Sequence, residues 1–156
     1  MNMGRVTIRQ AQHGDETAVG LMMASLWPDG VREEHQNEAA MLIETGMYGT
    51  LEGAILLALD DQKTPLGFFQ VGLRSHADGC DVSRPVGFIE GWFVRVEFRG
   101  QGIGRELMQA GERWARERGC LEMASDALID NEGSVRAHGA LGFEVVDRCV
   151  HFRKEL

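Results

Sequence analysis

Hydrophobic and polar residues follow two different spacings along the chain, and these spacings predict both strands and helices. Alternation of the two kinds in 5–9 and short apolar runs later in the chain predict strands. Apolar residues three or four positions apart predict amphipathic helices. The expected strands are 5–9, 53–59, 65–73, 86–96, 120–125, 143–146 and 150–153. The expected helices are 15–27, 31–45, 102–118 and 131–141.

The order of these elements, β-α-α-β-β-β-α-β-α-β-β, is typical of helices packed on a mixed sheet, so the fold class is α/β. The polar break at 60–63 predicts a hairpin between the strands on either side of it. Strand 86–96 carries apolar residues on both faces, and we expect it to be a central strand covered on both sides. No linker or repeat interrupts the order, so residues 1–156 are expected to form one domain.

Glu90 is an acidic residue within the apolar strand 86–96. An unpaired charge in a buried strand costs free energy, so this carboxylate needs a partner or a function. It either faces a cleft, where it binds substrate or relays a proton, or it forms a structural salt bridge.

Three alternate glycines, Gly100, Gly102 and Gly104, lie at the junction between this strand and the helix 102–118. Glycine allows the backbone to approach a ligand closely, and the free N–H groups and dipole at a helix start attract anions. The predicted ligand is a phosphate group, although a turn that needs glycine only for packing has the same pattern. Arg105 stands where a dinucleotide fingerprint requires glycine, and the Gly-Lys-Ser/Thr of a Walker loop is absent from the sequence.

The net charge of the chain limits the classes of molecule that we expect it to bind. With 24 acidic and 16 basic residues its formal charge is -8, which opposes nucleic-acid binding and favours small cationic partners, although an acidic surface also serves solubility. Cys80, Cys120 and Cys149 lack C-x-x-C spacing, so neither a disulfide framework nor a zinc site is indicated. Residues 1–10 lack a signal-like apolar stretch, and no segment is long enough to cross a bilayer. We expect a cytoplasmic protein without membrane or nucleic-acid partners.

The segment Arg99–Gly104, R-G-Q-G-I-G, resembles the Q/R-x-x-G-x-G/A signature of the GCN5-related N-acetyltransferases, the GNAT superfamily. Strand 92–96, Asn131 and the block 138–143 also match that family. The resemblance implies a GNAT fold with a mixed, mostly antiparallel central sheet, splayed between its fourth and fifth strands, and helices on both faces. It also implies a transferase in which an amine directly attacks the thioester of acetyl-coenzyme A (acetyl-CoA).

The same resemblance implies how acetyl-CoA is held. In the family, the exposed backbone of the strand that corresponds to 91–96 pairs with the pantetheine amides, and the glycine turn holds the pyrophosphate. No metal is required. The residues that the resemblance assigns to the donor are Phe93, Val94, Arg99, Gly100, Gln101, Gly102, Ile103, Gly104, Asn131 and His138.

Several blocks look more narrowly like aminoglycoside N-acetyltransferases that modify the 6'-amine. The blocks are 26–28, 78–81, 88–91, 122–126, 138–143 and 152–154. This resemblance implies acetylation of a cationic antibiotic, hence resistance, and a homodimer, since members of the family are often dimers. Two alternatives stay open: acetylation of another small amine, such as a polyamine or an amino sugar, and a non-catalytic CoA-binding regulatory module.

The resemblance makes Asp126 the best candidate for catalysis, and Glu90, singled out by its charge in an apolar strand, is the second candidate. Both would also contact the acceptor. Asp126 would bind and deprotonate the amine, directly or through water. A carboxylate of ordinary pKa is a weak base for an ammonium group, so its effect is expected to be more electrostatic than proton-abstracting. The alternative for Asp126 is a helix-capping role.

Further acceptor contacts are less specific. Trp27 could stack on a sugar ring or belong to the core. Asp29 and Asp147 are candidates for the other amines of the acceptor, as are Glu33 and Glu34, and a solvated surface position is the alternative for each.

His138 occupies a position where many acetyltransferases have a tyrosine that protonates the leaving thiolate. The tyrosine of this chain, Tyr48, is distant in sequence. His138 could contact coenzyme A or donate a proton, or it could be a packed or capping residue. The general acid is therefore left open by the sequence.

Overall fold

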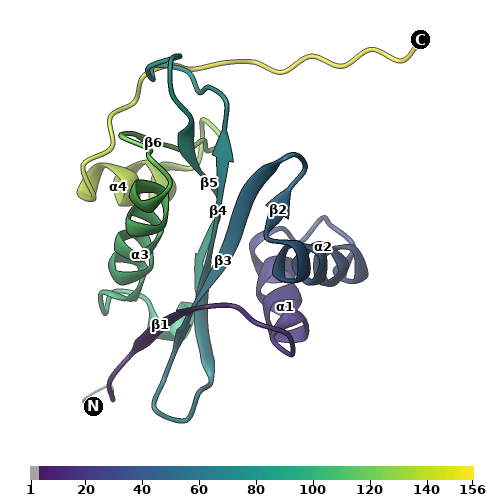
Figure 1. Cartoon of the computed structure of the whole chain (residues 1–156), viewed down its shortest axis with the longest axis vertical. Helices are drawn as coiled ribbons and strands as arrows, with labels where there is room; N and C mark the ends of the chain where they lie inside the picture. Colours follow the sequence, from purple (N-terminus) through teal and green to yellow (C-terminus); the bar gives the residue numbers. More distant parts are fainter. Residues whose placement is uncertain (1–3) are drawn as a thin grey trace.

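The computed structural model describes residues 4–156, and its centre is a sheet with helices on both faces (Figure 1). The strands are β1 (Thr7–Gln10), β2 (Met47–Tyr48), β3 (Leu51–Leu59), β4 (Pro65–Arg74), β5 (Val86–Val94) and β6 (Met123–Ala124). The helices are α1 (Glu16–Leu26), α2 (Arg32–Thr45), α3 (Ile103–Glu117) and α4 (Glu132–Ala140), with a 3-10 turn η1 (Val96–Phe98). Helices α1 and α2 cover one side of the sheet, and α3 and α4 lie on the other.

The sheet has the order β1-β3-β4-β5-β6, with β2 paired to β3. Strands β1 to β5 pair antiparallel, whereas β5 and β6 are parallel. Within the described residues, β5 and β6 pair only at Gly87↔Met123 and Phe88↔Ala124, beyond which β5 continues without β6. The predicted GNAT fold and its splay are thereby confirmed, the splay lying between the strands labelled β5 and β6.

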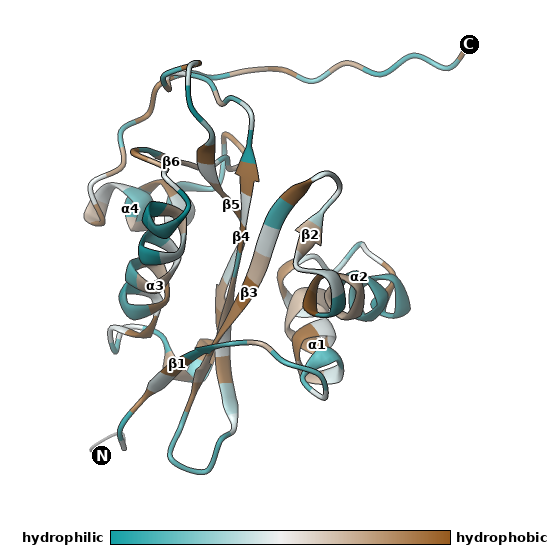
Figure 2. Cartoon of the chain, in the orientation of Figure 1, coloured by the Kyte–Doolittle hydropathy of each residue, from teal (hydrophilic) through white to brown (hydrophobic). Residues whose placement is uncertain are grey.

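Two hydrophobic cores hold the helices against the sheet. The predicted stripe of α3, namely Ile103, Leu107, Ala110 and Trp114, is buried against one face together with residues of β3, β4 and β5. A second core joins α1 and α2 to the opposite face, around Phe68. Figure 2 shows hydrophobic residues concentrated in the central strands. Because both faces are covered, β4 and β5 read as nearly continuous apolar runs in the sequence.

A β-bulge in β5 explains how this apolar strand accommodates an acidic residue. Gln70 pairs with Gly91 and the next residue, Val71, pairs with Ile89, so Glu90 is the extra residue of β5. A bulge re-aims a side chain and interrupts the alternation of the strand. The Glu90 side chain is 13% exposed, so it lies largely inside the fold.

The C-terminal part of the sequence prediction is wrong for the single chain. Residues 141–156 contain no strand, and β6 is reduced to two residues. The start of this segment still packs on the fold, with Leu141 and Phe143 against the core, whereas its yellow end extends away from the body in Figure 1. Val150 and Phe152 are 74% and 93% exposed. The alternation is present in the sequence, but a strand forms only where a neighbour satisfies its backbone hydrogen bonds, and no such neighbour stands beside it in the described chain. None of the helices within residues 4–156 is long and apolar enough to cross a membrane.

Candidate active site

The glycine turn precedes α3 as predicted, and its backbone requires glycine. Gly100 and Gly102 have φ of 74° and 87°, in the left-handed region that other residues rarely adopt. A Cβ built on either would have open space around it among the residues of the structure. Gly102 is the N-cap of α3, and no side chain of residues 4–156 caps that end. The first N–H groups of α3 are therefore available to an anion.

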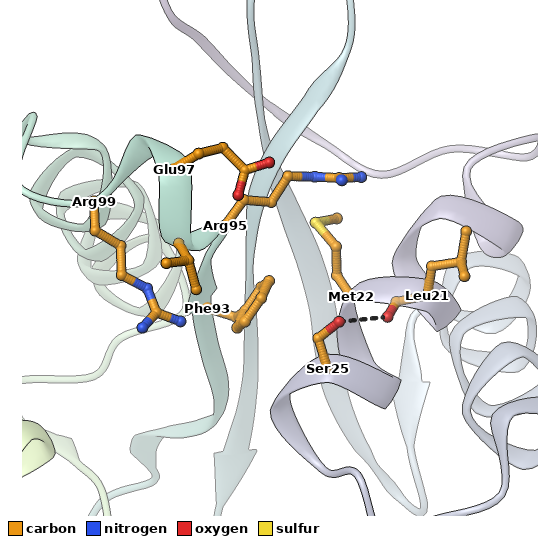
Figure 3. A pocket seen from close by; sticks show the side chains of 8 residues that line it. Leu21, Met22, Ser25, Phe93, Arg95, Glu97 and Arg99 are labelled. Carbon is orange, nitrogen blue, oxygen red and sulfur yellow. Dashed lines mark hydrogen bonds between the residues drawn. The ribbon is translucent and has the colours of Figure 1, made fainter.

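A cavity of about 350 Å³ lies between α1 and the segment that leads from β5 to the turn (Figure 3). Phe93, Arg95 and Arg99 line one side, and Met22 and Ser25 of α1 line the other. The Arg99 Nε donates to the Val94 carbonyl at 2.8 Å, so Arg99 folds back onto the end of β5. Of the predicted donor residues, Phe93 and Arg99 thus meet at this cavity.

A second cavity, of about 230 Å³, lies on the same face of the sheet beside the bulge. It is lined by Trp27, His35, Glu38, Tyr48, Gln70 and Glu90. Glu90 accepts two hydrogen bonds from the Arg74 guanidinium, at 3.1 and 3.0 Å. Arg74 in turn stacks 3.4 Å from the Phe88 ring centroid. Both interpretations of Glu90 therefore describe it in part: it lines a cavity and it forms a salt bridge.

Trp27 follows the last residue of α1, where Pro28 ends the helix, and its ring forms one wall of the second cavity. Its ring centroid is 5.8 Å from that of His35 and 6.4 Å from that of Phe68. A Cβ at Gly91 would lie 2.9 Å from Trp27 Cη2, so glycine is what allows the indole to lie against β5 beside Glu90. Trp27 packs on the core and also faces the cavity.

Sequence reasoning missed four residues of the second cavity, namely His35, Glu38, Tyr48 and Gln70. Gln70 is 1% exposed and its Nε2 donates to Glu38 Oε1 at 3.3 Å, while its Oε1 is buried without a partner in the described chain. Partial burial, then the charges of Glu38 and Glu90, raise the pKa of the Tyr48 phenol. A polar Gln70 within an apolar strand was a usable signal, like Glu90. Tyr48 lies in a two-residue strand, which has no detectable periodicity.

Other predicted residues lie either around β6 and α4 or on the exposed surface. Asp126 lies two residues after the end of β6 and is exposed. Asn131 caps α4 by accepting from the Ser134 N–H at 3.1 Å. His138 of α4 is half-buried and is hydrogen-bonded to the residue before Asp126. Asp29 and Asp147 are exposed and line neither cavity of the described structure. The single chain thus brings Trp27 and Glu90 together, but not Asp29 or Asp147.

Comparison with known proteins gives relatives over almost the whole chain. The chain is 39% identical over 149 residues to an aminoglycoside N(6')-acetyltransferase type 1 of Klebsiella aerogenes, with 96% of each chain covered. It is 38% identical over 150 residues to the protein of the same name from Stenotrophomonas maltophilia, covering 96% of this chain and 94% of the relative.

Solved structures of aminoglycoside acetyltransferases superpose on this chain over nearly its whole length. The aminoglycoside acetyltransferase AAC(6')-Iy, in complex with a bisubstrate analogue, CoA-S-monomethyl-acetylneamine, superposes with a TM-score of 0.87 at 32% identity, covering 98% of this chain and all of that one (100%). AAC(6')-Ih of Acinetobacter baumannii superposes with a TM-score of 0.85 at 32% identity, covering 97% and 99%. Residues 20–143 match the model of the acetyltransferase (GNAT) family. With its splayed sheet and its glycine turn at the start of α3, this chain belongs to the acetyltransferase (GNAT) family.

Proposed function

We propose that this protein transfers the acetyl group of acetyl-CoA to the 6'-amine of aminoglycoside antibiotics and so confers resistance to them. The observation that carries the proposal is the pairing of two sites on one strand. The glycine turn and the larger cavity adjoin the C-terminal end of β5, and the smaller cavity, with two carboxylates and an indole, adjoins its bulge. The relatives named above act as aminoglycoside N(6')-acetyltransferases, in agreement with this arrangement.

The donor is held by backbone groups. The N–H groups at the start of α3, freed by the glycine N-cap, bind the pyrophosphate of acetyl-CoA. The edge of β5 beyond Phe88, which β6 leaves unpaired in the described chain, offers N–H and C=O groups to the pantetheine amides. Arg99, Gln101 and Ile103 flank this path, and Asn131 and His138 of the α4 region complete the proposed donor site.

The acceptor amine attacks the thioester carbonyl directly, so the protein must hold it close and favour its neutral form. Asp126 takes up the proton of the amine, directly or through water. Glu90, fixed by Arg74, orients the acceptor, and Trp27 supplies a flat surface for a sugar ring. Asp29 and Asp147 remain candidates for the more distant amines.

The test is a thiol-release assay with acetyl-CoA and a panel of kanamycin-like aminoglycosides, polyamines and peptides. We expect turnover with the aminoglycosides, and we expect NMR of the product to show the acetyl group on the 6'-amine. Activity confined to polyamines would overturn the aminoglycoside assignment alone. Absence of turnover with every amine would overturn the enzymatic proposal and favour a CoA-binding module.

We also propose that the chain acts as one acetyltransferase domain, residues 1–156, that works as a homodimer in the cytoplasm. The exposed C-terminal segment supports the dimer, because its alternating apolar residues, among them Val150 and Phe152, have a strand pattern and would gain backbone and apolar partners from a second copy. The thiols of Cys80, Cys120 and Cys149 are free, as a reducing compartment requires.

A further inference from the structure

A serine and a histidine form a hydrogen-bonded pair between β6 and α4. The Nε2 atom of His138 is 2.8 Å from the Oγ atom of Ser125. Its Nδ1 atom is 2.7 Å from the carbonyl oxygen of Ser134. A carbonyl oxygen only accepts, so Nδ1 carries a hydrogen and donates it to Ser134. Nε2 therefore accepts from the Ser125 hydroxyl when the imidazole is neutral, and donates to it when the imidazole is protonated.

The pair stands where the two central strands separate. Ser125 is the first residue after β6, and the last pairing of β6 with β5 is Phe88↔Ala124. The imidazole bridges the opening, since its centroid is 5.4 Å from that of Trp92 on β5, with the rings edge to face. Phe143 contacts it in the same way at 5.3 Å. Edge-to-face aromatic contacts on two sides and hydrogen bonds at both nitrogens thus fix the orientation of His138.

The reaction needs a proton donor at this opening. When the amine displaces the acyl carbon from sulfur, coenzyme A leaves as a thiolate, and an ordinary thiol has a pKa of about 8.5, so protonation at neutral pH favours its departure. The carboxylate of the neighbouring Asp126 is assigned to the acceptor amine, whose proton it passes to water. The Ser125 hydroxyl is the adjacent group that can both donate a proton and be supplied with another from His138.

The geometry points to Ser125 as the residue that protonates the departing sulfur of coenzyme A, with His138 as the residue that positions and re-protonates it. This inference rests on the proposed acetyl transfer. The nitrogen–carbon bond forms and the carbon–sulfur bond breaks. Sulfur takes the Ser125 proton, Oγ takes the Nε2 proton of the imidazolium, and the surplus proton of the amine leaves through Asp126 and water. A proton taken up from water then restores the imidazolium, so one amine and one thioester give one amide and one thiol.

The experiment compares Ser125→Ala, Ser125→Thr and Ser134→Ala in single-turnover acetylation of kanamycin by enzyme preloaded with acetyl-CoA. Loss of the Ser125 hydroxyl is expected to slow the acetyl-transfer step about 100-fold while the acetyl-CoA dissociation constant changes less than about twofold. Threonine keeps the hydroxyl and should restore the rate to within about tenfold of wild type. Ser134→Ala is the matched control: it removes a hydroxyl 3.2 Å from the same imidazole but keeps the carbonyl that His138 uses, so the rate should be nearly unchanged.

Three outcomes would overturn the inference. The first is a wild-type rate in Ser125→Ala, and the second is an equal loss in Ser125→Ala and Ser134→Ala. The third is a Ser125→Thr protein that folds and binds acetyl-CoA normally but transfers the acetyl group about 100-fold more slowly than wild type. This third outcome is decisive even if Ser125→Ala folds poorly. An active wild type with any of these results leaves the proposed function standing. A wild type that acetylates no amine would overturn both.

Discussion

At the scale of single residues, the two carboxylates of the smaller cavity differ in how far their charge is compensated. Glu90 is held by two hydrogen bonds from Arg74. Glu38 accepts from the neutral amide of Gln70 and is paired with no basic side chain in the described part of the chain. A cationic acceptor that enters this cavity therefore meets the uncompensated charge at Glu38. Sequence analysis names Glu90, and not Glu38, as an acceptor contact.

Replacing Glu38 by Gln is expected to raise the KM for kanamycin about tenfold, since a charged hydrogen bond contributes about 1.5–3 kcal/mol. The kcat should change little, because Glu38 is not proposed to take part in proton transfer. Glu44→Gln is the matched control, an exposed acid in the last turn of the same helix. A KM that moves equally in both variants would mean that overall charge, and not this cavity, attracts the acceptor.

The division between donor and acceptor sites is tested by Gly102→Val. With φ of 87° at this position, a β-branched side chain forces the turn out of shape, so acetyl-CoA affinity should fall at least about tenfold. Isothermal titration with acetyl-CoA measures it. Asp126→Asn is the reciprocal variant, with normal acetyl-CoA binding and slower acetylation. Loss of acetyl-CoA affinity in Asp126→Asn, or normal affinity in Gly102→Val, would show that a residue has been assigned to the wrong substrate.

At the scale of elements, the docking of α3 depends on a glycine against the sheet. A Cβ at Gly111 would overlap the ring of Phe69 in β4. Gly111→Ala gains about 1 kcal/mol of helix propensity but costs about 1–3 kcal/mol of overpacking, so we expect net destabilisation in urea unfolding. Gly139→Ala in α4 is the control: apart from its chain neighbours and the backbone of its own helix, no described atom lies within 4 Å of its Cβ, so it should stabilise by up to about 1 kcal/mol. Stabilisation by both changes would contradict this packing.

An ion pair ties β1 to the start of α1. Arg9 donates to Asp15 at 2.7 and 3.1 Å, and this hydrogen-bonded pairing lowers the pKa of Asp15. A carboxyl whose pKa is lowered by folding stabilises the fold above its ordinary pKa of about 4, and loses that effect as the pH falls through the lower, folded value.

Asp15→Asn should therefore cost about 1 kcal/mol of unfolding free energy at pH 7, and the difference from wild type should shrink as unfolding is measured below pH 4. Glu132→Gln is the control, because its pair with Arg136 is long, at 3.6 Å, and exposed, so no change is expected. A difference for Asp15→Asn that stays constant with pH would exclude the ion pair as its source.

The elements that sequence analysis predicted well are those whose pattern a single segment determines. Helix α3 shows its buried stripe within fifteen residues, and the glycine turn is a local motif. The smaller cavity is different, because Trp27, Glu38, Tyr48 and Gln70 come from separate elements that meet only when α1, α2 and β2 pack on the sheet. The closing strands were predicted from a real alternation, but a strand also needs a neighbour, which no local pattern reveals.

At the scale of the whole molecule, the C-terminal segment leaves several apolar side chains exposed along one stretch of the chain. Val145, Val146, Val150 and Phe152 are 61%, 63%, 74% and 93% exposed. An isolated chain with these residues in water forgoes the free energy of burying them, about 1.5–3 kcal/mol for each side chain that becomes fully buried. A second copy that supplies a strand edge would recover it, and this is the physical basis of the proposed homodimer.

Phe152→Asp is therefore expected to convert the proposed dimer to a monomer, because a charge would have to be buried at the contact without a partner. Sedimentation equilibrium measures the mass, and circular dichroism should show the body of the fold unchanged, since Phe152 is outside both hydrophobic cores. Leu121→Asp is the control, an exposed apolar residue (72%) between α3 and β6 that should leave the dimer intact. A wild-type protein that sediments as a monomer, or a Phe152→Asp protein that stays dimeric, would show that this segment does not form the contact.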